Sequence, residues 1–153
     1  MAPLVVENPQ ALTKLAGQEI AVTDWMTLEQ QRISQFAEAT EDRQWIHVDR
    51  ERAAKESPYG TTIAHGFLTL SLLSHFLKQA IDVRGVRMAI NYGLNRVRFP
   101  AAARSGARIR ARVTLQSAEE RANCVEATFA MAIECEGEKK PCCAAEWVIR
   151  FYS

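Results

Sequence analysis

Two side chains that can exchange protons lie close together near residue 45 of the chain. The segment Glu41-Asp42-Arg43-Gln44-Trp45-Ile46-His47 places Asp42 and His47 five positions apart. An imidazole titrates near neutral pH, and an aspartic acid can accept or donate a proton when burial raises its pKa. Together the two groups are sufficient for general acid–base catalysis. The alternative interpretation is a C-terminal helix cap beside a surface histidine, because a motif without its structural context is weak evidence.

The spacing of Asp42 and His47 restricts the backbone conformation between them. Side-chain neighbours on a helix lie three or four residues apart, so positions five apart do not share a helix face. For Asp42 and His47 to meet, the chain must leave the preceding helix after about Thr40 and turn. Loops held by rigid elements are where catalytic residues concentrate.

A second candidate segment leads from polar residues into the most apolar stretch of the chain, from Thr61 to Phe67. The first N–H groups of a helix have no partner within it, and the helix dipole favours negative charge there. Because Gly66 has no side chain, a carbonyl oxygen can reach those groups, which is the geometry of an oxyanion hole. Alternatively, Gly66 only permits close packing. Ser71, farther along, either bonds the carbonyl four residues earlier or contacts a catalytic group or a bound thioester.

The elements predicted around these residues are helical in the first half of the chain. Asn8 and Asp49 are good N-caps, and Thr27 with Gln30 forms a capping box. The predicted elements are a helix from Pro9 to Gly17, a brief strand from Ile20 to Thr23, and helices from Thr27 to about Thr40, from Asp49 to about Lys55 and from His65 to Ile81. The last helix is apolar nearly all round, so we expect it to be buried on most sides.

The second half is predicted to form strands because apolar residues alternate with polar ones there. The segments are Met88 to Phe99, Arg108 to Gln116, Cys124 to Cys135 and Ala144 to Tyr152. Helices followed by strands indicate a single α+β domain over residues 1–153. Four or five antiparallel strands with one long helix predict a sheet wrapped around that helix, and its exposed edges favour dimerisation.

Composition excludes several classes of protein. With 19 basic and 18 acidic residues the formal net charge is +1. This balance does not indicate a protein that binds nucleic acid or a membrane surface. The apolar stretch from Ile63 to Leu77 is shorter than the ~20 residues of a bilayer span. The first ten residues lack the features of a secretory signal, so we expect a soluble, cytoplasmic protein. The four cysteines form no CxxC pair, so we expect no metal site at them. We interpret them as reduced, small hydrophobic residues.

Together these segments resemble a known family. FAEATEDRQWIHVD (36–49) and GTTIAHGFLTLSLLSHF (60–76) are similar to the MaoC-like dehydratases, which include the R-specific enoyl-CoA hydratases. Their pattern is an Asp, four residues and a His, then a downstream His-Gly that opens a long helix. Asp42, His47, His65 and Gly66 match it. AINYGLNRVRFPAAARSGARIRARV (89–113) is similar to the family's sheet segment. The nearest likeness is the subgroup of nodulation protein N, and it runs from about residue 15 to the C-terminus.

The resemblance implies a hot-dog fold, in which a curved antiparallel sheet wraps a long central helix, and a homodimer. It implies an R-specific enoyl-CoA hydratase, a hydro-lyase of fatty acid metabolism that adds water to trans-2-enoyl thioesters. Asp42 and His47 would hold the water, and one of them would take its proton. Asp42 would deliver a proton to the α-carbon; alternatively, the two residues share both tasks. The thioester oxygen would meet the N–H of Gly66, with His65 and Ser71 as further substrate-binding residues. The acyl-CoA is a substrate, and neither a cofactor nor a metal is implied.

Some features depart from the family or leave other functions open. Many hydratases have Asn-Pro-Leu between the two catalytic positions. Here Gln44 is a possible polar support, and Trp45 replaces the proline and adds bulk. An acyl-CoA thioesterase on the same fold is an alternative, although the helix from Gly66 has no acidic residue, and a non-catalytic acyl-thioester-binding subunit is another. The sequence does not define the acyl length or choose between CoA and a carrier protein. We interpret the arginines of the strands as a solvated face rather than as phosphate contacts.

Overall fold

The long strands of the second half form the sheet that shapes the molecule. The structure is a computed structural model that describes residues 1–153. Six strands pair in the order β2-β6-β7-β8-β5, with β3 also on β6, and every pairing is antiparallel. The strands are β2 (Gln18–Val22), β3 (Met26–Thr27), β5 (Met88–Arg98), β6 (Arg108–Glu120), β7 (Val125–Cys135) and β8 (Cys143–Tyr152). The predicted alternation is clearest in β7, where every second residue is buried.

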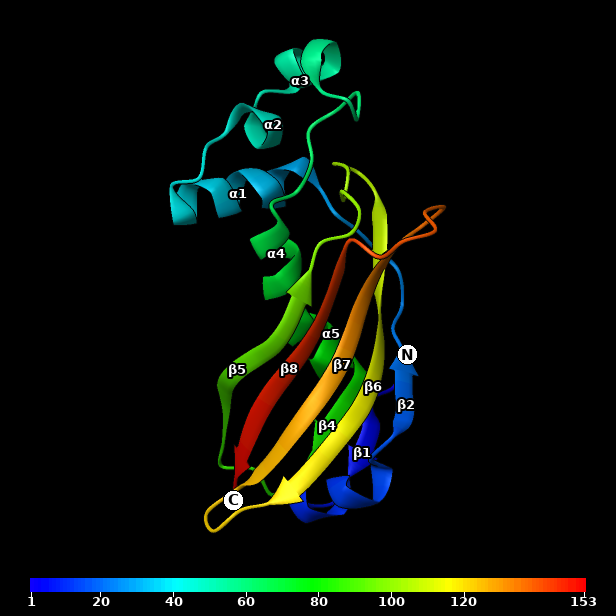
Figure 1. The fold of residues 1–153 in the computed structure, drawn as a ribbon, viewed down its shortest axis with the longest axis vertical. Helices are drawn as coiled ribbons and strands as arrows, with labels where there is room; N and C mark the ends of the chain where they lie inside the picture. The colour runs from blue at the N-terminus through cyan, green and yellow to red at the C-terminus, as the bar shows by residue number, and fades with distance from the viewer.

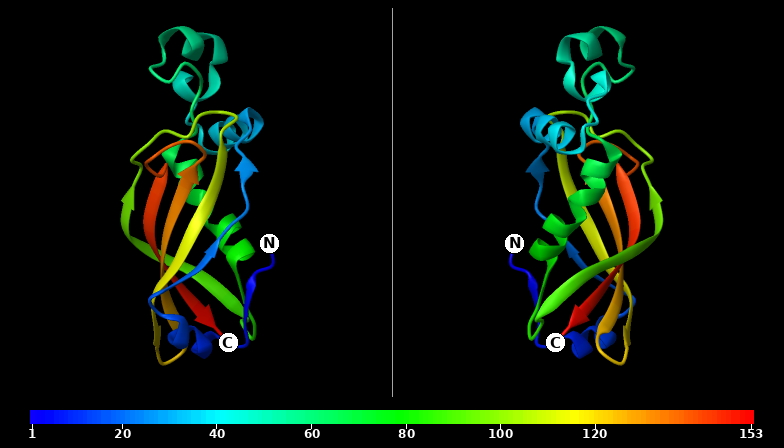
Figure 2. Two further views of the ribbon diagram at one scale, coloured as in Figure 1. Left: turned by 90° about the vertical axis from the view of Figure 1, so that its right-hand side faces the viewer. Right: turned by 90° about the vertical axis from the view of Figure 1, so that its left-hand side faces the viewer.

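The sheet curves around a central helical segment, as the two side views show (Figure 2). The helices are η1 (a 3₁₀ helix, Pro9–Leu15), α1 (Gln30–Thr40), α2 (Trp45–Val48), α3 (Arg50–Glu56), α4 (Gly66–Ser71) and α5 (Leu73–Ala80). A small parallel pair, β1 (Leu4–Val6) with β4 (Ile81–Val83), lies apart from the main sheet. The arrangement confirms the predicted α+β hot-dog fold. None of the helices is both long and apolar enough to cross a membrane.

The core between α5 and the sheet fixes where the central segment lies. Leu73, Phe76, Leu77 and Ala80 of α5 are buried, and Phe76 joins Phe129 of β7 among the side chains with no exposed surface. Full burial of such a side chain stabilises the fold by roughly 1.5–3 kcal/mol. This anchoring also fixes α4, whose N-terminus lies near the end of the sheet where α1, α2 and α3 gather (Figure 1).

The central helix differs from the continuous helix predicted over His65 to Ile81. It consists of α4 and α5, joined at Leu72, and it ends at Ala80 because Ile81 begins β4. At the joint the N–H of Leu72 is shared between the carbonyls of Leu68 and Thr69, at 3.1 and 3.2 Å. The Ser71 hydroxyl bonds the carbonyl of Phe67 one turn back, a contact that often bends helices. Phe67 is 70% exposed, so the prediction that this helix is buried on most sides is wrong at that position.

The start of α1 also differs from the prediction. Thr27 does not open a helix but belongs to β3, where it pairs with Arg108 of β6. The helix begins at Gln30, after Glu29 as N-cap, so the predicted capping box does not form. The strand pairing outweighs the local capping signal, and it leaves the Gln30 side chain free to make contacts elsewhere. By contrast, the predicted caps Asn8 and Asp49 both form, accepting from the N–H of Ala11 and of Arg52.

Candidate active site

The turn after α1 positions Asp42. The helix ends at Thr40 as the spacing predicted, and Glu41 adopts a left-handed conformation with φ of 62°. This reversal takes Asp42 off the helix into a loop, where its side chain is exposed. The Oδ1 atom of Asp42 accepts from the backbone N–H of Gln44 at 3.4 Å. The carboxylate therefore keeps most of its capacity to accept hydrogen bonds.

His47 lies on α2, a helix of a single turn, and is buried with only 7% of its surface exposed. Its Nδ1 lies 2.7 Å from the carbonyl oxygen of Ile63. Because a carbonyl only accepts, Nδ1 carries the proton and Nε2 keeps its lone pair. Burial lowers the pKa of His47 below 6.5 and neighbouring His65 adds to the shift, whereas the Ile63 carbonyl and Asp42 oppose it. At neutral pH His47 is thus a neutral imidazole with one free basic nitrogen.

His65 joins the two halves of the site. It is 3% exposed, and its Nε2 donates to the main-chain carbonyl of Asp42 over 2.9 Å. Its ring stacks on that of His47 with the centroids 3.8 Å apart and the planes 23° from parallel. A carboxylate oxygen of Asp42 and one ring nitrogen each of His47 and His65 lie within 4.8 Å of one another. The structure thus brings Asp42 and His47 together as the spacing required, and His65 holds the Asp42 backbone.

The three side chains also make up the group that could ligate a metal ion. Each histidine donates one ring N–H to a backbone carbonyl. The arrangement fixes the tautomers of both imidazoles, which is what directed proton transfer requires.

Gly66 lies beside this group and begins α4. A cavity of about 240 Å³ is lined by both His47 and Gly66, together with Tyr59, Thr69, Phe99 and Cys142. A β-carbon on residue 66 would lie 3.1–3.2 Å from three ring atoms of Phe99, so the glycine is required for close packing. Its N–H, the first of the helix, has no partner within α4. Both interpretations of Gly66 therefore have structural support, and both concern the same cavity.

Comparisons with known proteins identify the family of this chain. Residues 11–134 match the model of the MaoC like domain. The chain belongs to the MaoC-like domain family. A relative named 3-hydroxyacyl-thioester dehydratase Z, from Mycobacterium tuberculosis, is 49% identical over 146 residues, which cover 95% of this chain and 96% of the relative. Nodulation protein N of Rhizobium leguminosarum bv. viciae is 46% identical over 134 residues, covering 86% of this chain and 83% of that protein. The predicted family and subgroup are confirmed.

Solved structures of MaoC-like domains and related proteins share the fold. A monoamine oxidase regulatory protein from Archaeoglobus fulgius superposes with a TM-score of 0.76 at 21% identity, covering 100% of this chain and 99% of that one. The (R)-hydratase from A. caviae gives a TM-score of 0.69 at 23% identity, covering 86% and 95% of the two chains. At these identities the likeness establishes the hot-dog fold.

Two other predicted site residues of this MaoC-like domain make backbone contacts. Ser71 is exposed, and its hydroxyl donates to the Phe67 carbonyl at 2.7 Å, the alternative contact considered for it. Gln44 is exposed as well. It supports the site through its backbone, whose N–H contacts Asp42 and whose carbonyl accepts from the N–H of His47 at 3.0 Å.

The sequence interpretation missed two residues that contact the site. The Nε2 of Gln30 donates to the main-chain carbonyl of His47 at 2.8 Å, and its Oε1 accepts from the hydroxyl of Thr62. Thr62 is completely buried. The signal at Gln30 was assigned to a capping box, and Thr62 was noted only as part of a polar run. Nothing in the spacing of positions 30, 47 and 62 indicates that they meet.

The arginines of the sheet are largely paired with acids. Arg108 pairs with Glu136, Arg110 with Glu134, and Arg112 with both Glu134 and Glu19. These pairs are partly exposed and screened by solvent, so each adds little to stability. They agree with the solvated interpretation of this strand face.

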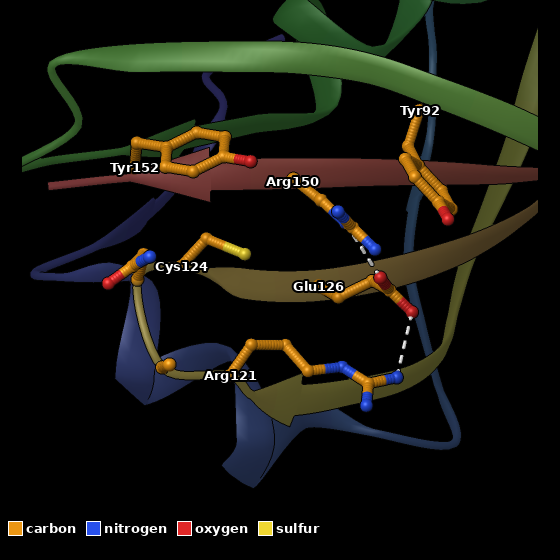
Figure 3. A pocket seen from close by; sticks show the side chains of 8 residues that line it. Tyr92, Arg121, Cys124, Glu126, Arg150 and Tyr152 are labelled. Carbon is orange, nitrogen blue, oxygen red and sulfur yellow. Dashed lines mark hydrogen bonds and ion pairs between the residues drawn. The ribbon is translucent and has the colours of Figure 1, made fainter.

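A second cavity, of about 360 Å³, lies near the β6–β7 turn and the C-terminus, at the opposite end of the sheet (Figures 1 and 3). In Figure 3 the side chains of Arg121 and Arg150 converge on Glu126, at 3.1 and 2.8 Å. The Arg150 guanidinium also lies 3.6 Å from the centre of the Tyr92 ring. Glu126 offsets one of the two arginine charges of this cavity, whose residues are separate from the Asp42 group.

The remaining sequence features have structural explanations. Asn91, which had no assigned role, accepts a hydrogen bond from the indole N–H of Trp147 at 2.8 Å. The cysteines are free thiols, and Cys135, Cys142 and Cys143 are buried among apolar residues. Burial raises the pKa of Cys143 to about 11, so this thiol stays neutral. Three of the four cysteines are thus small core residues, as predicted.

Proposed function

We propose that this protein is an R-specific enoyl-CoA hydratase, which adds water reversibly to trans-2-enoyl thioesters. The observation that carries the proposal is the grouping of the Asp42 carboxylate with a neutral His47, in which Nε2 is free and Nδ1 is fixed. The same cavity contains both His47 and Gly66. The kinship with a protein named as a 3-hydroxyacyl-thioester dehydratase supports this reaction class.

In the proposed reaction a water molecule lies between Asp42 and His47. The Nε2 of His47 accepts one hydrogen bond from that water and orients it. The Asp42 carboxylate takes the other proton as the water oxygen attacks the β-carbon, and returns this proton to the α-carbon. The elements of water are then fully added across the double bond. General acid–base catalysis of this kind contributes about 10²–10⁴-fold.

The N–H of Gly66 is the proposed partner of the thioester oxygen, which gains negative charge as the β-carbon is attacked. A donor placed for that charge contributes about 10²–10³-fold. The reaction requires neither a metal nor a redox cofactor, because the alkene is already polarised by the thioester.

We place the acyl chain along the central helix. A cavity of about 320 Å³ lies there, and its lining residues are Leu70, Ser71, Leu73, Ser74, Asn91, Leu94 and Trp147. Leu70 is four residues after Gly66, which corresponds to about 6 Å along a helix axis. A chain whose carbonyl oxygen is held at Gly66 can therefore reach this cavity. The Trp147 indole N–H donates to Asn91, so these two lining residues hold each other in place.

The proposal is tested with purified protein and a short trans-2-enoyl-CoA. Hydration removes the absorbance of the conjugated enoyl thioester without releasing free thiol. We expect Asp42→Asn and His47→Gln to lower kcat/KM by about 10²–10⁴-fold. The matched controls are Asp82→Asn and His75→Gln, two exposed positions outside the site, which should retain wild-type rates. Chiral analysis of the product tests the R configuration.

Two results would contradict the proposal. Release of thiol by the wild-type protein would make it a thioesterase. If neither the enoyl absorbance falls nor thiol is released across several acyl lengths, the result would favour a subunit that binds thioesters without converting them.

A further inference from the structure

The Gln30 side chain uses all of its hydrogen-bonding groups. Its Nε2 donates to the His47 carbonyl at 2.8 Å and to the Ser34 hydroxyl at 3.2 Å. Its Oε1 accepts from the hydroxyl of Thr62, a residue with no exposed surface. Gln30 thus connects the start of α1, the α2 turn and the buried segment that precedes α4.

The α2 turn needs such contacts. A helix of four residues is too short to be stable alone, because the nucleation cost exceeds what one turn returns. Three hydrogen bonds from outside hold it. The N–H of Ile63 donates to the Ile46 carbonyl at 3.0 Å, His47 donates from Nδ1 to Ile63, and Gln30 donates to the His47 carbonyl. His47 is therefore held at its ring by Ile63 and at its main chain by Gln30.

We propose that Gln30, fixed in turn by Thr62, is a positioning residue for the hydration reaction. It holds the main chain of His47 so that Nε2 stays directed at the water shared with Asp42. This inference rests on the proposed function. Gln30 is not itself a lining residue of the cavity, and it acts through the main chain of His47.

The first test is the variant Gln30→Leu, which removes these hydrogen bonds but keeps a side chain of similar size. A displacement of about 1 Å at a catalytic group can cost about 10²-fold in rate. We expect kcat to fall by about 10- to 100-fold. KM should change little, because Gly66 and the acyl cavity are untouched.

Matched variants separate positioning from general destabilisation. Gln35→Leu is the same substitution at an exposed position of the same helix and should retain the wild-type kcat. Thr62→Val removes the hydroxyl that holds Gln30, whereas Thr62→Ser keeps it. Thr62→Val should lower kcat as Gln30→Leu does, and Thr62→Ser should keep most of the wild-type kcat.

The deciding measurement does not depend on turnover. The imidazole titration of His47, followed by NMR, reports how the residue is held, and the titratable groups facing it are Asp42 and His65. In Gln30→Leu we expect the pKa of His47 to rise toward 6.5, because a loosened ring is better hydrated. Gln35→Leu should leave it unchanged.

The outcomes are distinct. A fall in kcat together with a raised His47 pKa, in Gln30→Leu and Thr62→Val alone, supports the proposal. An unmoved titration in both variants, or a kcat equal to that of Gln35→Leu, overturns it. If the wild-type protein shows no hydration, the proposed function fails, and the titration still decides whether Gln30 positions His47.

Discussion

At the scale of single residues, the site is defined by the tautomers of two histidines. Both His47 and His65 donate one ring N–H to a main-chain carbonyl, of Ile63 and Asp42 respectively. The backbone therefore decides which nitrogen of each ring is basic. For His47 this leaves Nε2 as the acceptor, beside a carboxylate that is open to solvent. The proposed catalytic pair depends on this fixed arrangement as much as on the identity of its two side chains.

A pH profile tests the state of His47. Its pKa is lowered from 6.5, chiefly by burial, so the neutral form persists as the pH falls through 6.5. Because the proposed reaction uses neutral His47, we expect kcat/KM to stay near its maximum at pH 6.5 and to fall only at lower pH. The profile should be measured with a short enoyl-CoA at constant ionic strength. An acidic limb centred at or above pH 6.5 would contradict this assignment.

At the scale of elements, α4 and the chain around Phe99 meet at Gly66. The ring of Phe99 lies 3.1–3.2 Å from where a β-carbon on residue 66 would be, and it also packs edge-on against Phe67 with the ring centroids 6.3 Å apart. Phe99 is 43% exposed, so its ring can move when it is crowded. The start of α4 and the lining of the cavity are therefore coupled through one contact.

Gly66→Ala tests which use of this glycine matters. The added methyl group should displace the Phe99 ring into the cavity and lower kcat/KM by about tenfold, at a cost in stability of about 1 kcal/mol. The double variant Gly66→Ala/Phe99→Leu decides between the interpretations. Recovery of the rate indicates that packing alone requires the glycine, and continued loss indicates that access to its N–H does.

Elements with a strong local signal were predictable from the sequence, and elements that depend on distant partners were not. The alternation in β7 and the caps at Asn8 and Asp49 appear as expected. The start of α1 does not, because Thr27 pairs with Arg108, which lies far along the chain. The break at Leu72 follows from serine hydroxyls bonding the backbone, which apolar periodicity does not register.

The same distinction applies to the site. Asp42, His47, His65 and Gly66 stand in two short motifs, and a family resemblance identifies them. Gln30 and Thr62 belong to no motif, and their contact with His47 exists only once three separate segments have packed together. Sequence spacing therefore indicates the groups that exchange protons better than the groups that hold them in place.

At the scale of the whole molecule, β5 is left as an unprotected edge. It is the last strand in the sheet order, and nearly all of its eleven residues are exposed. Met88, Ile90, Tyr92 and Leu94 are between 40% and 57% exposed. A long edge strand with unpaired backbone groups and apolar side chains readily pairs with another chain. We propose that two copies pair through β5 and extend the sheet into a homodimer.

Lysine substitutions on this edge test the dimer. The wild-type chain of 17.2 kDa should have about twice that mass in solution by light scattering. Ile90→Lys/Leu94→Lys places two like charges on each facing strand, and repulsion between them should yield monomers. Leu4→Lys is the matched control, because Leu4 is also 40% exposed but lies on β1, away from the edge. A monomeric wild-type protein, or a dimer that withstands both lysines, would place the contact elsewhere. Because Asn91 and Leu94 line the acyl cavity, separation should also lower hydration of longer acyl chains more than that of short ones.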